Sequence, residues 1–170
     1  MEFSLAQGLG LVSFALGVSA FYQKDDRKLK IMMVLLNLNH MVHFFLLEAI
    51  TSAMSALLSA FRTGLSIKFQ SKNLAYIFIG LNLIAGYVLA DGWLDILPIM
   101  GACIGSYALF CLSGIKMRLA FVVGAVCWLI NNIVVGSIGG VMLEVTLLTV
   151  NITTIYRLYK SDGLALKEAR

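Results

Sequence analysis

The stretch from Asn37 to Leu47 reads NLNHMVHFFLL and lies inside a long apolar run. It holds Asn37, Asn39, His40 and His43, which the hydrocarbon core of a membrane tolerates only where they face protein or a water-filled cavity. On a helix, His40 and His43 lie three residues apart and share a face, and Asn39 lies four residues before His43. The pattern predicts a membrane helix with one polar face, which we expect to line a route or pocket for a small polar solute.

The composition is typical of a multi-span membrane protein. Hydrophobic residues make up 60% of the chain and charged residues 13%, and the mean hydropathy is +0.91, whereas soluble domains usually carry about 25% charged residues. A helical span needs about 20 mainly apolar residues, so this length holds about seven spans with short loops. We therefore expect an all-α protein that forms a single integral membrane domain over residues 1–170.

The apolar runs and the charged segments between them place the spans. The expected helices, in order, are 3–22, two within 31–67, 73–90, 94–112, and two within 117–159. The two long runs should break near Glu48 to Ser52 and at GSIGG, residues 136–140, because each is too long for one span. Pro98 falls in the first turn of its helix, where proline costs little. Residues 160–170 are expected to form a short cytoplasmic tail.

The charges predict the orientation. If seven helices alternate, all 13 Lys and Arg residues fall on one side of the membrane. Glu2, Glu48, Asp91 and Asp95 fall on the other side. Since basic loops stay in the cytoplasm, we expect the N-terminus outside and the C-terminus in the cytoplasm. The net charge of +4 is then a topology signal, and no nucleic-acid partner is expected.

The chain also suggests an internal repeat. Shifting it by 88 residues, from Leu9 to Leu97, aligns the basic loop, the long apolar run, the small-residue turn and the closing basic cluster without a gap. The shift places His40 on Trp128 and His43 on Asn131. Three helices (3–67), a linker helix (73–90) and three more helices (94–159) would form a parallel repeat, as in several transporter folds.

Three segments resemble a known family. They are QKDDRK (23–28), NHMVHFFLLEAITSA (39–53) and WLINNIVVGSIGG (128–140), and with them nearly the whole chain resembles the bacterial inner-membrane YgjV family. The arrangement of three, one and three helices is similar to that of the SWEET, PQ-loop and PnuC transporters. The resemblance implies two three-helix bundles around a central path. The paired prolines of SWEET and PQ-loop helices are missing, since Pro98 is the only proline, so their proline hinges are not expected here.

His40, His43, Trp128 and Asn131 are the first candidates for a solute-binding site between the repeats. An aromatic wall beside an amide suits sugars or nucleoside-like solutes. Two alternatives stay open: the histidines could only join helices, through hydrogen bonds worth about 0.6 to 2 kcal/mol in membranes, and Trp128 could simply pack in the bundle. A zinc site made of both histidines and Glu144 would have few ligands and is not favoured.

Glu144 and Asn151 complete the expected substrate-binding set. A lone carboxylate inside a membrane helix is costly, so Glu144 should find a partner, for which His43 is suited, or stay protonated. Asn151 is the repeat equivalent of Thr63 on the cytoplasmic half. Arg62 is expected to extend towards the lipid headgroups.

The sequence favours a facilitative transporter for a small, uncharged or weakly charged solute. It contains no phosphate-binding loop, HExxH or GxSxG motif, so neither an enzyme nor a cofactor is expected. The cysteine spacings suit neither a metal site nor a disulfide framework. The alternative function is a receptor or assembly protein that binds without transporting. A homodimer is possible, because Gly136 and Gly140 have GxxxG spacing.

Overall fold

The fold is known from a computed structural model, which describes the backbone of residues 5–21, 26–112 and 114–168. Within these residues the chain forms seven α helices, one short 3-10 helix and no strand. The elements are α1 (Leu5–Phe21), α2 (Asp26–Leu46), α3 (Ile50–Ser66), α4 (Lys72–Leu89), η1 (Trp93–Asp95), α5 (Ile96–Cys111), α6 (Gly114–Val134) and α7 (Ile138–Glu168).

Two of the expected boundaries need correction. The second break spans only residues 135–137, so Gly139 and Gly140, which were expected in the break, belong to the first turn of α7. The expected tail, 160–170, is not a separate segment, because α7 continues as a helix to Glu168. Polar residues end the apolar span without ending the helix, since leaving the bilayer does not stop backbone hydrogen bonding.

The helices have the surface of a membrane bundle. Four segments are long and apolar enough to cross a bilayer: Lys72–Leu89, Trp93–Cys111, Ile115–Val134 and Ile138–Arg157; Leu5–Ala20 and Lys30–Leu46 are shorter apolar helices. Large apolar side chains lie on the outside, as on α4, where Ile84, Tyr87 and Val88 are exposed. Many buried positions are instead Ser, Thr, Asn or His. An apolar exterior around a polar interior fits a lipid environment.

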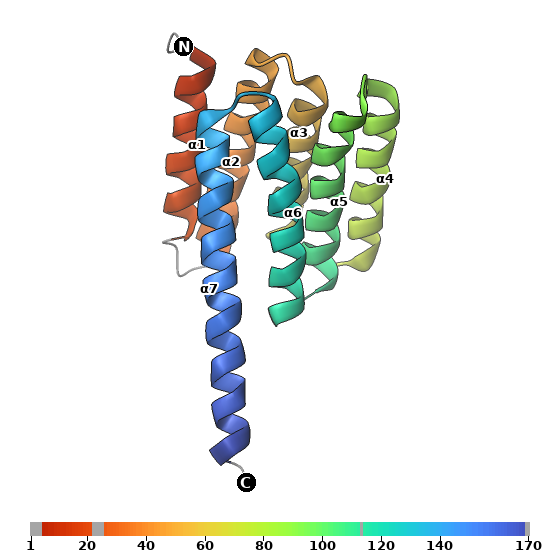
Figure 1. Ribbon diagram of the computed structural model, residues 1–170. Helices are drawn as coiled ribbons and strands as arrows, with labels where there is room; N and C mark the ends of the chain where they lie inside the picture. The colour runs from red at the N-terminus through yellow and green to blue at the C-terminus, as the bar shows by residue number, and fades with distance from the viewer. Residues whose placement is uncertain (1–4, 22–25, 113, 169–170) are drawn as a thin grey trace.

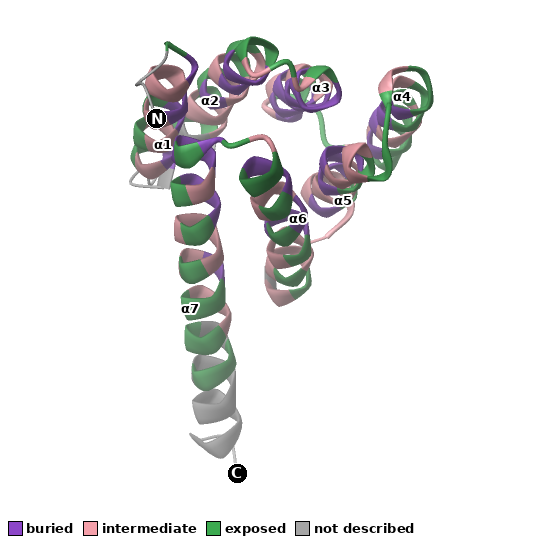
Figure 2. Cartoon of the chain, turned by 45° about the horizontal axis from the view of Figure 1, so that its top comes forward, coloured by how far each residue is buried: buried purple, intermediate pink, exposed green. Residues whose placement is uncertain are grey.

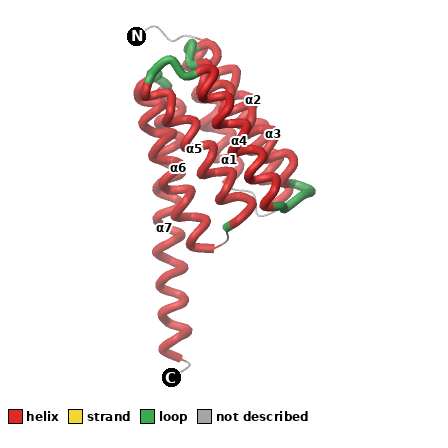
Figure 3. The backbone as a smooth tube through the Cα atoms, turned by 90° about the vertical axis from the view of Figure 1, so that its right-hand side faces the viewer, coloured by secondary structure: helices red, strands yellow, loops and turns green. Residues whose placement is uncertain are grey.

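Six helices form a ring and α4 lies outside it. Within each half the helices pack in chain order, α1 on α2 on α3 and α5 on α6 on α7, and the ring closes where α3 meets α5 and α1 meets α7. The linker helix α4 packs against α3 and α5 only, apart from minor contacts. Figure 1 shows successive helices running antiparallel, Figure 2 shows the ring from its tilted top, and Figure 3 shows α7 extending beyond the other helices.

The two ends of the bundle differ in charge. Alternation of the helices brings the starts of α2, α4 and α6 to one end, with Arg27, Lys28, Lys30, Lys68, Lys72, Lys116 and Arg118, which we call the basic end. Glu48, Asp91 and Asp95 lie at the opposite, acidic end, near the top in Figure 1. Lys24 lies outside the described residues.

The turns α2–α3 and α6–α7 have the same hydrogen bonds, 88 residues apart. Ala49 donates its backbone N–H to the carbonyl of Phe44 (3.0 Å), and Ser137 donates to that of Asn132 (2.8 Å). Both are the six-to-one bonds of a Schellman motif, which needs a left-handed residue after the helix. Glu48 (φ 59°) and Gly136 (φ 72°) occupy that position. The two preceding helices, Asp26–Leu46 and Gly114–Val134, have the same length of 21 residues.

This geometry predicts opposite effects for two substitutions. Glu48→Gly should raise the free energy of unfolding by about 0.5 to 1 kcal/mol, because glycine adopts a positive φ without steric cost. Gly136→Ala should lower it by about 1 kcal/mol for the same reason. Both changes can be measured as shifts in thermal unfolding of the purified protein in detergent. A destabilising Glu48→Gly would contradict the left-handed turn.

Candidate functional site

His43 joins three elements at the acidic end. Its ring is fully buried, with Nδ1 2.6 Å from the carbonyl oxygen of Ala6 in α1 and Nε2 2.6 Å from the hydroxyl oxygen of Ser137 in the α6–α7 turn. A carbonyl can only accept, so Nδ1 carries the proton and Nε2 accepts from Ser137. Both nitrogens are thus used, and the predicted pairing of His43 with Glu144 is wrong. His43 therefore links α2 to α1 and to the α6–α7 turn.

His40 lies one turn earlier and differs in one respect. It is also buried, but its Nε2 has no hydrogen-bond partner among the described residues. Its ring centroid lies 6.1 Å from that of His43 and 5.2 Å from that of Phe44. A buried polar atom without a partner costs free energy unless a ligand or water satisfies it. The two histidines therefore differ: both ring nitrogens of His43 have partners, whereas His40 Nε2 has none among the described residues.

Phe44 brings the candidates from the two halves together. Trp128 of α6 stacks on Phe44, with ring centroids 5.8 Å apart and planes inclined by 23°. One turn further along α6, Asn131 accepts a hydrogen bond from the hydroxyl of Ser52 (3.0 Å), and its Nδ2 has no partner among the described residues. Trp128 thus packs against Phe44 of the other half. The aromatic pair joins α2 to α6, and each of these helices carries one buried polar atom without a partner in the described residues, His40 Nε2 on α2 and Asn131 Nδ2 on α6.

A row of hydroxyl groups runs along α3, and sequence reasoning missed it. We call it the hydroxyl column: Ser52, Ser55, Ser59, Thr63 and Ser66, spaced three or four residues apart and all buried. Such spacing puts them on one face of the helix, and Figure 2 shows buried residues along α3. Ser55 and Ser59 form no hydrogen bond within the described part of the chain. The regular spacing of Ser and Thr in the sequence was the signal that could have revealed it.

Glu144 and Asn151 both lie on α7. Glu144 is buried, and no hydrogen bond or ion pair joins it to any residue that the structure describes. Asn151 donates to the carbonyl of Leu147 (2.9 Å) and lies 3.5 Å from a guanidinium nitrogen of Arg118. Asn151 has partners within the protein, whereas Glu144 has none in the described residues.

Arg62 does not extend to the headgroups, contrary to expectation. Only 9% of its surface is exposed, and it hydrogen bonds to Ala102 and Ser106 of α5. Where α5 packs against α3, its residues Ala102, Gly105 and Ser106 are small and leave room for the guanidinium. The side chain therefore turns into the bundle instead of out to the lipid.

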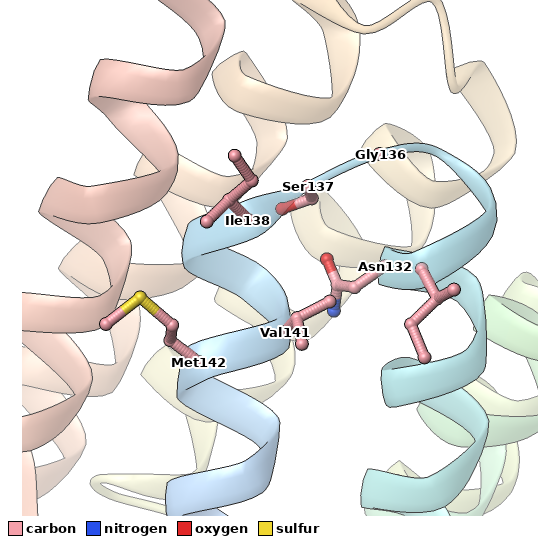
Figure 4. A pocket seen from close by; sticks show the side chains of 7 residues that line it. Asn132, Gly136, Ser137, Ile138, Val141 and Met142 are labelled. Atoms are coloured by element: carbon pink, nitrogen blue, oxygen red, sulfur yellow. The ribbon is translucent and has the colours of Figure 1, made fainter. Parts of the chain in front are cut away.

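A hollow of about 330 Å³ lies beside the α6–α7 turn (Figure 4). Its lining residues are Asn132, Ile133, Gly136, Ser137, Ile138, Val141 and Met142. Ile133, Ile138 and Met142 are exposed, so the hollow opens to the outside of the bundle. Its lining is largely apolar, which fits contact with lipid rather than a route for a polar solute.

The Gly136–Gly140 spacing does not form a helix face for a dimer. Gly136 lies in the turn, and a Cβ on Gly140 would meet the side chains of Asn132 and Ser137 of the same chain. A dimer would therefore need another surface. In the described residues the structure has no group of three His, Cys, Asp or Glu side chains that could hold a metal ion, and Cys103, Cys111 and Cys127 are free thiols.

Comparison with known proteins identifies relatives along almost the whole length. Residues 4–162 match a family model described as bacterial inner membrane protein, Imp-YgjV. The chain is similar to the inner membrane protein YgjV of Escherichia coli (strain K12), with 35% identity over 156 residues, which is 92% of this chain and 85% of that protein. No solved structure gives a significant match.

Proposed function

The chain belongs to the YgjV family of bacterial inner membrane proteins, and from this premise we propose that it transports a small polar solute across that membrane. The proposed site lies between the two three-helix halves, beside His40 and Asn131. The proposed solute is a sugar- or nucleoside-like metabolite, because planar aromatic surface next to unpaired amide and imidazole groups suits such molecules.

One observation supports the proposal above all: unpaired polar atoms inside a membrane bundle. His40 Nε2 and Asn131 Nδ2 are buried without partners in the described residues, and the hydroxyl column continues from their level to the basic end. A protein that needed polar groups only for helix association would pair them. Polar groups inside a membrane protein commonly mark a substrate or ion pathway.

The matching turns support a transport cycle in which two equivalent halves rock against each other. The proposed halves are α1 to α3 and α5 to α7, and their most extensive contacts in the described residues are those of α1 with α7 and of α3 with α5. These two contacts correspond to each other if α1 is equivalent to α5 and α3 to α7. With the basic end in the cytoplasm, rocking would open the site to each side in turn.

Facilitated movement is proposed over ion-coupled movement. Glu144 is the one acidic side chain among the buried residues that the structure describes. Its position in the other half is occupied by Ala56, so the two halves do not present a matched pair of acids. No catalytic step is proposed.

Water access to the proposed path is the property that tests transport. Single cysteines would replace His40, Asn131 and Ser55 in a protein lacking Cys103, Cys111 and Cys127, and a membrane-impermeant thiol reagent would be applied from each side. We expect labelling at these positions from both sides, because an alternating path exposes the same groups in turn. The readout is the labelled fraction in sealed vesicles of known orientation.

Three further cysteines control the assay. Gln70 and Gly92 are exposed at the basic and acidic ends respectively, so each should label from one side only. Ile84 points out from α4 and should stay unlabelled, because it faces lipid. Labelling of positions 40, 55 and 131 from one side alone would favour a receptor. No labelling at any of the three would leave only a structural role for these residues. Either result would contradict transport.

A further inference from the structure

Arg62 is a buried cation that forms no ion pair within the described part of the chain. It lies four residues before the end of α3, in the half of the bundle nearer the basic end. Its side chain is 91% buried, since 9% is exposed. Within the described residues no acidic side chain forms an ion pair with it. An unpaired arginine inside a membrane protein is costly, so such residues usually face a partner, a cavity or a ligand.

The hydrogen bonds of the guanidinium leave one edge free. Nη1 donates to the carbonyl of Ala102 (3.0 Å) and to the hydroxyl of Ser106 (3.2 Å), which uses both of its hydrogens. Nε has no partner, and Nη2 donates to none of the described residues. Nε and Nη2 lie side by side on one edge of the guanidinium plane. This edge forms two parallel N–H···O bonds with carboxylate and phosphate groups.

The surroundings hold the guanidinium in place and add to its positive field. A Cβ on Gly105 would lie 2.8 Å from Nη1, so a larger residue at this point of α5 would push the guanidinium from its present position. Among the residues that the structure describes, neither the hydroxyl of Ser59, one turn earlier on the same face, nor the buried Oγ1 of Thr63 has a hydrogen-bond partner. Lys30 of α2 donates to the carbonyl of Ser66 (2.6 Å), one turn beyond Arg62.

We propose that the free edge of Arg62 binds an oxyanion, a phosphate or carboxylate group, in the α3–α5 seam near the basic end. The site combines a bidentate donor with neighbouring hydroxyl groups, Lys30 binds α3 one turn further along, and no acidic residue that the structure describes forms an ion pair with Arg62. The anion can come from solution or from an anionic lipid headgroup, because both offer the same oxygen atoms. The proposal does not depend on transport.

Binding of inorganic phosphate tests the site. The full-length protein, purified in a neutral detergent and freed of phosphate, would be titrated with phosphate while sodium chloride keeps the ionic strength constant. We expect the midpoint of thermal unfolding to rise and saturate for the wild-type protein. Arg62→Gln should lose this response or need at least about tenfold more phosphate. Arg62→Lys should respond more weakly than wild type, because an ammonium cannot form the paired bonds.

A second arm identifies a lipid as the source. The same proteins would be placed in nanodiscs of phosphatidylcholine alone or with phosphatidylglycerol. If the headgroup is the ligand, phosphatidylglycerol should stabilise the wild-type protein but not Arg62→Gln, and phosphate should then have little effect. Such a result would support the site equally.

Two variants make the test decisive. Arg118→Gln removes another arginine near the basic end, whose contact is with Asn151, and it should respond like the wild type. Gly105→Ala keeps every charge but crowds Nη1, and it should weaken the response even if Arg62→Gln does not fold. The proposal is overturned if the wild-type protein responds to neither anion, or if Arg62→Lys and Gly105→Ala both respond as fully as Arg118→Gln.

Discussion

Gly139→Ala should lower the free energy of unfolding by about 3 kcal/mol, one of the two largest effects that the structure predicts. A Cβ at Gly139 would collide with the carbonyl group of Gly10 and the amide nitrogen of Leu11. These are backbone atoms, so no side chain can turn aside, and α1 and α7 would have to move apart. Forcing atoms into a packed contact typically costs about 1 to 3 kcal/mol, and separating two helices places this case at the upper end. Denaturation in mixed detergent micelles would measure it.

Gly80→Ala is the matched control for this substitution. Gly80 lies inside α4, and a Cβ there would meet no atom within 4 Å. Alanine has the higher helix propensity by about 1 kcal/mol, so this variant should be as stable as the wild type or slightly more so. If Gly139→Ala were equally harmless, the backbone contact between α1 and α7 would be wrong, and with it the closure of the ring.

The positions of the helices could be predicted because they depend on local properties. Apolar length and charged interruptions lie within a few residues of each boundary, so the two long runs were divided close to the observed turns at 47–49 and 135–137. The first residues of α7 were misplaced because Gly139 and Gly140 resemble a turn. They are glycines for another reason, the close packing against Gly10 and Asn132.

The partners of the polar residues could not be predicted in the same way. Whether His43 meets Glu144 or Ser137 depends on the order of the helices around the ring and on the rotation of each helix. Neither property follows from hydropathy. Arg62 illustrates the difference. Its side chain turns into the interior instead of towards the lipid headgroups because α5, about 40 positions further along the chain, has small residues there. The hydroxyl column could have been predicted, because its spacing lies within α3 alone.

Comparing His40 with His43 tests which buried polar residues stabilise the fold through their hydrogen bonds. His43 uses both ring nitrogens, each at 2.6 Å from its partner, and connects α1, α2 and the α6–α7 turn. The Nε2 atom of His40 has no hydrogen-bond partner among the described residues. Both rings contact Phe44 at centroid distances of 5.2 Å. Removal of either ring therefore takes away similar aromatic contact, and the difference between the two variants isolates the hydrogen bonds.

His43→Ala should lower the free energy of unfolding by about 3 to 4 kcal/mol. The loss combines a cavity with the two hydrogen bonds to Ala6 and Ser137. His40→Ala should cost about 1 to 2 kcal/mol less, because it breaks no bond to Nε2 and removes an unpaired buried atom. Unfolding of both variants in mixed micelles, followed by Trp fluorescence, gives the two values. Equal losses would mean that His40 is also a structural residue, and the site proposed beside it would then rest on Asn131 alone.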